Sequence, residues 1–187
     1  RGPPSPELLL AAGGFVLGAL TDALDGFLAR RWNVVSHFGR VMDPFADKLL
    51  VLGAFVMLAG PNFALRLAPD QTVQLSSVQP WMVVVMLARE LLVTSLRGVL
   101  ESRGVDFSAT LTGKLKMILQ SLCIPLVLLL MGLTPLVRNT AEPTLAGSIV
   151  VVTVWATVVV TAWSGVPYVL RALRHFQRST PQTHTPP

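Results

Sequence analysis

Five long apolar stretches dominate this chain of 187 residues and limit the folds that are open to it. Most of them approach or exceed the roughly 20 helical residues that cross a hydrocarbon core of about 30 Å. Backbone groups inside lipid must hydrogen-bond within their own segment, so such stretches predict helices. Only 13% of the residues are charged, about half the usual share of a soluble domain. We therefore expect an all-α, polytopic transmembrane helix bundle with five spans, at approximately 8–29, 44–59, 81–100, 114–133 and 146–170.

Basic residues are distributed unevenly between the two ends of these spans. Two loops rich in Pro, Asn and Ser, Gly60–Pro80 and 135–143, are expected to be exposed on one side, which holds only Arg66 and Arg138. Lys and Arg concentrate on the cytoplasmic side of membrane proteins, so the opposite, basic end should face the cytoplasm. We expect an integral protein of the inner or plasma membrane. The basic end would carry Arg30, Arg31, Arg40, Lys48, Arg97, Arg103, Lys114, Lys116, Arg171, Arg174 and Arg178.

Cysteine content and net charge exclude several classes of function. The single cysteine, Cys123, allows neither an intramolecular disulfide nor a thiolate metal cluster. A net charge of +5 is common in nucleic-acid-binding proteins, but here the basic residues are scattered among apolar segments. We therefore expect attraction to anionic lipid and to phosphorylated substrates, and no nucleic-acid partner.

Four aspartates, Asp22, Asp25, Asp43 and Asp47, occur within one short segment between apolar runs. Carboxylates at membrane depth are costly and need a partner. The i, i+3 spacing of the first pair and the i, i+4 spacing of the second place each pair on one face of a helix. Two such pairs on facing helices would present hard oxygen ligands, which suit Mg²⁺ or Mn²⁺. Buried ion pairing with nearby arginines is the structural alternative.

The aspartates belong to a longer pattern, D-x2-D-G-x2-A-R-x8-G-x3-D-x3-D, which runs from Asp22 to Asp47. The pattern resembles the defining motif of the CDP-alcohol phosphatidyltransferases at every fixed position. Shorter matches resemble the phosphatidylglycerophosphate synthase branch of that family. They are AREL at 88–91, LR at 96–97, GKLK at 113–116 and SGxxYxxRA at 164–172.

The resemblance implies a reaction and roles for the aspartates. That branch transfers a phosphatidyl group from CDP-diacylglycerol to sn-glycerol 3-phosphate and releases CMP. By resemblance, Asp22, Asp25 and Asp43 bind one or two Mg²⁺ or Mn²⁺ ions, and Asp47 is the general base that can also touch metal. The resemblance also implies a cytoplasm-facing cavity, a homodimer and six helices. The chain supplies five, so we expect a membrane domain over 1–177 that lacks the first family helix, followed by a disordered tail, 178–187.

Small residues near the aspartates are candidates for contact with the cytidine nucleotide. Gly26, Ala29 and Gly39 would let the nucleotide approach the backbone, although close helix packing in the membrane explains small residues equally simply. Arg30 is fixed in the motif and is either a ligand contact or a cytoplasmic anchor.

Glycerol 3-phosphate is a dianion, so its site should present Lys or Arg. The candidates are Arg89, Arg97, Lys114 and Arg171. Arg89 lies deep in an apolar helix, which favours function, but a structural bond to neighbouring Glu90 or to a motif aspartate is the alternative. The other three lie near helix ends, where long basic side chains also reach out of the lipid. Lys116 is interpreted as a membrane-surface charge, and Tyr168 as either an interfacial anchor or a hydrogen-bonding residue of the cavity.

Other functions are compatible with parts of the pattern. The acceptor alcohol of the same reaction is open between glycerol 3-phosphate and phosphatidylglycerol, serine or inositol phosphate. A membrane prenyltransferase also holds a pyrophosphate through aspartate-bound Mg²⁺, but the motif spacing with its embedded G-x2-A-R argues against it. A cation channel or transporter would use the carboxylates without binding cytidine.

Overall fold

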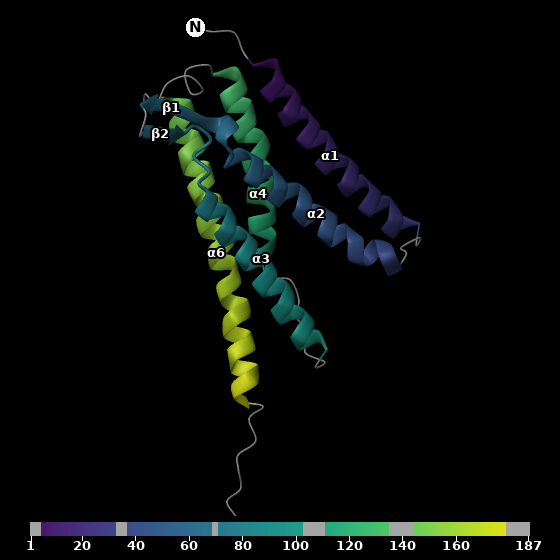
Figure 1. Cartoon of the computed structure of the whole chain (residues 1–187). Helices are drawn as coiled ribbons and strands as arrows, with labels where there is room; N and C mark the ends of the chain where they lie inside the picture. The colour runs from purple at the N-terminus through teal and green to yellow at the C-terminus, as the bar shows by residue number, and fades with distance from the viewer. Residues whose placement is uncertain (1–4, 33–36, 69–70, 103–110, 135–143, 179–187) are drawn as a thin grey trace, which may run out of the picture.

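Five long helices and one short hairpin form the described part of the chain (Figure 1). This computed structural model describes residues 5–32, 37–68, 71–102, 111–134 and 144–178. Some side chains within these ranges, among them those of 37–44 and 175–178, also lie outside the description. The helices are α1 (Pro6–Arg31), α2 (His37–Leu58), α3 (Pro80–Glu101), α4 (Leu111–Leu133) and α6 (Leu145–Arg178).

Each helix falls on one of the five predicted apolar stretches, which confirms the all-α membrane fold. The second stretch differs most, because α2 begins at His37 instead of Pro44. Three of the described helices are long and apolar enough to cross a membrane, namely Pro6–Leu28, Leu115–Leu133 and Leu145–Arg174. At 1.5 Å per residue, α2 and α3 are each about 33 Å long. Their charged residues reduce their hydropathy, so the number of spans stays a prediction.

The connection between α2 and α3 contains regular structure, so the prediction of a wholly exposed loop is wrong. A 3-10 turn, η1 (Pro61–Phe63), leads into strands β1 (Ala64–Ala68) and β2 (Gln71–Gln74). The strands pair antiparallel, with Leu65 opposite Val73. Ser77, whose φ is 59°, turns the chain toward α3.

The hairpin region satisfies the carbonyl groups that α2 leaves unpaired at its end. Ser76 Oγ donates to Leu58 O at 2.6 Å, and Gln74 Nε2 donates to Leu58 O at 2.8 Å and to Gly60 O at 3.1 Å. Ser76 is completely buried. The polar residues Gln74 and Ser76, which suggest an exposed loop, instead cap the end of α2.

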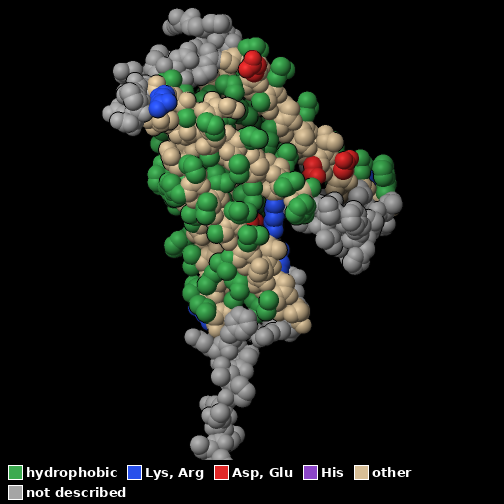
Figure 2. Space-filling view, viewed as in Figure 1, with side chains coloured by type: hydrophobic (Ala, Val, Ile, Leu, Met, Phe, Trp, Pro, Cys, Tyr) green, Lys and Arg blue, Asp and Glu red, His purple; other side chains and the backbone are tan. Residues whose placement is uncertain are grey.

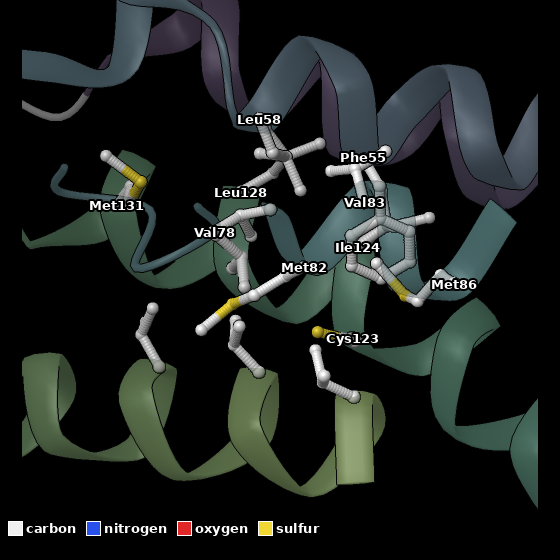
Figure 3. Packing of buried hydrophobic residues seen from close by; sticks show 14 of the residues in the cluster. Phe55, Leu58, Val78, Met82, Val83, Met86, Cys123, Ile124, Leu128 and Met131 are labelled. Atoms are coloured by element: carbon white, nitrogen blue, oxygen red, sulfur yellow. The ribbon is translucent and has the colours of Figure 1, made fainter. Parts of the chain in front are cut away.

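The main apolar core lies where α2, α3, α4 and α6 meet, with one residue from α1 (Figure 3). Phe55 on α2, Met82 and Met86 on α3, and Ile124 on α4 are among its fully buried members. On α6, Val150, Val154 and Val158 follow the spacing of one helical face. These residues fix the relative positions of the four helices.

Large apolar side chains also cover the outside of the helices (Figure 2). Leu17, Val152 and Trp163 are examples, with about two thirds of their surface exposed. A soluble monomer rarely shows so much contiguous apolar surface. Together with the three long apolar helices, this surface identifies a membrane protein.

A layer of buried polar residues separates the main core from a second apolar cluster of Val93, Leu100, Tyr168 and Ala172. The layer includes residues from α3, α4 and α6, which are each less than 10% exposed. Its members are Arg89, Glu90, Lys116, Gln120, Thr161 and Ser164. Buried polar groups carry a desolvation cost, so a layer of them within a membrane bundle indicates a functional site.

Candidate functional site

A cavity of about 440 Å³ opens at the polar layer and is lined by α2, α3, α4 and α6. Figure 2 shows basic side chains in a notch between the helical column and the arm that α1 and α2 form. The charged lining residues are Asp47, Lys48, Arg89, Glu90, Arg97 and Lys116. Counting each side chain in its ordinary ionised form, basic groups outnumber acidic groups in this lining, so the cavity favours an anionic ligand.

The α2 wall supplies the motif carboxylate and a neighbouring ammonium group. Asp47 is half-buried and lines the cavity. Lys48 Nζ donates to Thr94 Oγ1 on α3 at 2.6 Å. This bond connects α2 to α3 at the rim and holds the Lys48 ammonium against the opposite helix.

Arg89, Glu90 and Lys116 form the charged floor of the cavity. Arg89 Nη1 donates to Glu90 Oε1 at 3.1 Å, and Lys116 Nζ donates to the same oxygen. All three side chains are buried. The bond between Arg89 and Glu90, the structural alternative for Arg89, is therefore present. Both residues line the cavity, so the bond does not exclude a ligand contact.

Two residues of α6 contact the Arg89 guanidinium. Arg89 Nη2 donates to the carbonyl of Ser164 at 3.4 Å, and Arg89 Cζ lies 6.0 Å from the centroid of the Tyr168 ring. That separation is at the limit of a cation–π contact. Tyr168 is only 3% exposed and lines the cavity, so it is a cavity residue and the interfacial-anchor interpretation is wrong.

The motif residues on α1 lie on a helix, as their spacing predicts, but away from this cavity. Asp22 and Asp25 are exposed, Gly26 is half-buried, and no described residue of α1 lines the cavity. Gly39 and Asp43 fall within α2 and Ala29 and Arg30 within α1, but the side-chain environments at these positions lie outside the description.

The described carboxylates suit a divalent cation in their chemistry, because Asp22, Asp25 and Asp47 offer the hard oxygen donors that Mg²⁺ prefers. Among the side chains that the structure describes, no three acidic, His or Cys groups lie close enough together to hold a metal ion. Asp43 is not in that set, so the predicted four-carboxylate centre stays a prediction.

The basic residues named for the acceptor fall into three groups. Arg89 and Arg97 line the cavity, Arg171 is exposed outside it, and the Lys114 side chain lies outside the description. The interpretation of Lys116 as a membrane-surface charge is wrong, because Lys116 is only 6% exposed and its ammonium donates to Glu90. Helical spacing provides the missing signal. Lys116 lies seven residues before the buried Cys123 and therefore shares its face of α4.

Most of the chain matches one protein family. The family model described as CDP-alcohol phosphatidyltransferase matches residues 5–163, which include the whole aspartate motif and the residues lining the floor of the cavity. The chain belongs to the CDP-alcohol phosphatidyltransferase family. Members of this family generally depend on a divalent cation.

Curated relatives in the CDP-alcohol phosphatidyltransferase family carry related names. A CDP-diacylglycerol–glycerol-3-phosphate 3-phosphatidyltransferase of Bacillus subtilis is 37% identical over 115 residues, or 62% of this chain and 52% of that protein. A probable phosphatidylglycerophosphate synthase of Mycobacterium tuberculosis is 35% identical over 160 residues, or 86% of this chain and 64% of that protein. The matches span between about half and two thirds of the length of these relatives.

Proposed function

We propose that this protein transfers a phosphatidyl group from CDP-diacylglycerol to sn-glycerol 3-phosphate and releases CMP. The observation that carries the proposal is the cavity in which Asp47 of the family motif shares a lining with Arg89, Arg97 and Lys116. The names of the relatives support glycerol 3-phosphate as the acceptor. A phosphorylated acceptor also agrees with the excess of basic groups in the cavity.

In this proposal the aspartates of the motif serve the donor. One or two divalent cations, Mg²⁺ or Mn²⁺, would be held by Asp22, Asp25, Asp43 and Asp47. The positive charge of the cations offsets the negative charge of the pyrophosphate. Gly26, Ala29 and Gly39 would leave room for the cytidine and its phosphates, with Arg30 beside them. These assignments rest on the family motif and on the chemistry of its residues.

Asp47 is the proposed general base. A hydroxyl oxygen of the acceptor attacks the phosphorus that bears the diacylglycerol, and the bond from that phosphorus to the CMP oxygen breaks. The hydroxyl proton passes to the Asp47 carboxylate, because an alcohol is a weak nucleophile near neutral pH. The half-buried place of Asp47 in the lining of the basic cavity supports this role.

The acceptor phosphate would be bound by Arg89, Arg97 and Lys116. Each lines the cavity, and Arg89 and Lys116 are buried there, so their charges are less screened than those of surface groups. Lys114 and Arg171 remain proposed contacts from the family-like segments of the sequence.

The test is a reconstitution of the full chain with CDP-diacylglycerol, Mg²⁺ and each candidate acceptor. We expect CMP release and a phosphatidylglycerophosphate product with glycerol 3-phosphate. Equal or faster turnover with phosphatidylglycerol, serine or inositol phosphate would replace the proposed acceptor, and the absence of CMP release with every acceptor would refute the reaction.

The variant Asp47→Asn tests the general base. We expect kcat to fall by about 10²- to 10⁴-fold, the usual contribution of general-base assistance. Calorimetric binding of CMP in Mg²⁺ should be largely retained. A variant that keeps wild-type turnover would exclude Asp47 as the base. Lost CMP binding with lost turnover would assign Asp47 to donor binding instead.

We also infer, from the family resemblance, that the protein is a homodimer.

We further infer that the active site faces the cytoplasm. The hairpin carries Arg66 at one end of the bundle, whereas α3 and α6 finish at the other end (Figure 1). Cys123 is fully buried, so it should not react with an impermeant maleimide. The variants Arg66→Cys and Arg174→Cys can therefore be labelled selectively in intact cells. Labelling of the first variant alone supports the orientation, and labelling of the second alone reverses it.

A further inference from the structure

One carboxylate oxygen holds two cations from different helices. Glu90 Oε1 on α3 accepts from its neighbour Arg89 at 3.1 Å and from Lys116 Nζ on α4. The three side chains are between 6% and 9% exposed, and all of them line the cavity. In their ordinary ionised forms they leave one positive charge in excess, so the group suits an anion.

Arg89 also packs closely against α6 at the position of Gly165. A Cβ added at Gly165 would lie 3.3 Å from Arg89 Cγ and 3.9 Å from Arg89 Nε. The first separation is tighter than an ordinary van der Waals contact, so the Arg89 stem would have to shift. The carbonyl of the preceding residue, Ser164, accepts from Arg89 Nη2 at 3.4 Å.

Donor groups remain on this unit after its internal bonds are formed. Arg89 Nε is buried and has no hydrogen-bond partner within the described part of the chain. The Lys116 ammonium has three hydrogens, and it donates to Glu90 Oε1. A purely structural ion pair would be sealed in the core, whereas Arg89 and Lys116 are both lining residues of a cavity.

We propose that Glu90 and Gly165 are positioning residues for the acceptor phosphate. Glu90 holds the Arg89 guanidinium and the Lys116 ammonium together on one oxygen, so that both bind the phosphate at the same time. Gly165 leaves the space that the Arg89 stem needs in this position. Neither residue has to touch the acceptor. The inference rests on the proposed function, since it assigns the phosphate of the acceptor to these two cations.

The first experiment compares Glu90→Gln and Gly165→Ala with the wild-type full chain in lipid nanodiscs. CMP release is measured while glycerol 3-phosphate and CDP-diacylglycerol are varied in turn. Glu90→Gln keeps the shape but removes the charge that holds two repelling cations. We expect its KM for glycerol 3-phosphate to rise by about ten- to a hundredfold, as when a charged hydrogen bond is lost. The KM for CDP-diacylglycerol should stay within about twofold.

Gly165→Ala keeps the proposal testable if Glu90→Gln fails to fold. Alanine is the better helix former, and this gain offsets the cost of shifting the Arg89 stem, so the melting temperature should change little. The KM for glycerol 3-phosphate should nevertheless rise by about three- to tenfold, because small misplacements of a binding group are costly. Gly98→Ala on α3 is the matched control, since a Cβ there meets no atom within 4 Å. Its kinetics should equal those of the wild type.

A second experiment separates this inference from the proposed function. Equilibrium dialysis with radiolabelled inorganic phosphate measures anion binding without turnover. If the wild type binds phosphate but releases no CMP, and Gly165→Ala weakens that binding, the positioning role stands while the reaction fails. Unchanged phosphate binding and KM in Gly165→Ala overturn the positioning role of Gly165, and the same result in folded Glu90→Gln overturns that of Glu90. An equal rise in both KM values, or a wild type that binds no phosphate and shows no turnover, overturns the whole inference.

Discussion

Replacing Lys116 by methionine is the most informative single change, because Lys116 lies in the cavity and not at the surface, where its sequence position suggests it should be. Lys116 is 6% exposed, and Glu90 Oε1 accepts from its ammonium. Methionine keeps a long unbranched side chain and removes the ammonium group, with its charge and its N–H donors. If Lys116 binds the acceptor phosphate, the variant loses one charged hydrogen bond, worth about 1.5–3 kcal/mol. The KM for glycerol 3-phosphate should therefore rise by about 10- to 150-fold.

The free energy of unfolding should fall by less than the loss of a buried ion pair usually costs. Removing one partner of a buried ion pair costs about 3–5 kcal/mol when it leaves a charge uncompensated. Here Glu90 keeps Arg89 at 3.1 Å, and the cost of desolvating the ammonium disappears. We expect the free energy of unfolding to fall by less than about 3 kcal/mol.

The assay is CMP release in nanodiscs against the concentration of glycerol 3-phosphate, with thermal unfolding measured on the same sample. Arg174→Gln is the control, because it removes an exposed charge from α6 outside the cavity lining. Its KM should remain that of the wild type. A folded Lys116→Met protein with an unchanged KM for glycerol 3-phosphate would refute the assignment of Lys116 to the acceptor.

Two further predictions concern stability. Ser76→Ala removes the hydroxyl that donates to Leu58 O at 2.6 Å inside the hairpin region. It should lower the free energy of unfolding, measured in detergent, by about 1–3 kcal/mol, and an unchanged value would exclude a capping role. Gly132→Ala places a Cβ 2.9 Å from Leu9 Cδ2, where α4 meets α1. It should destabilise by about 1–3 kcal/mol through overpacking, which exceeds the gain in helix propensity, and a stabilised protein would contradict the close contact.

The positions of the helices could be predicted because long apolar runs leave the chain few alternatives in lipid. The hairpin could not, because Gly60, Pro61 and Pro69 are equally typical of an irregular loop. Its strands are short, and the polar residues that follow them become buried only through contact with the end of α2. That contact depends on tertiary structure, which local composition does not report.

The candidate site was predicted in part. The motif indicated Asp47, and an arginine within an apolar helix indicated Arg89, because both features are unusual in their local sequence. Lys116 was missed, since its place near a helix end is typical of a surface lysine. Its helical register with Cys123, which is buried, indicates the inward face of α4, but the position near a helix end favours the surface interpretation. Whether Asp22, Asp25 and Asp43 converge with Asp47 stays a prediction.

The length of α6 determines the depth at which the cavity lies in the membrane. At 1.5 Å per residue, Tyr168 lies about 35 Å along the helix from Leu145. A helix that enters the hydrocarbon near Leu145 has therefore crossed its thickness of about 30 Å before it reaches Tyr168. On that path the cavity lies at the boundary between the hydrocarbon and the aqueous side of the membrane. The proposed acceptor, a water-soluble dianion, and the proposed lipid-borne donor would then meet at this boundary without either entering the phase that excludes it.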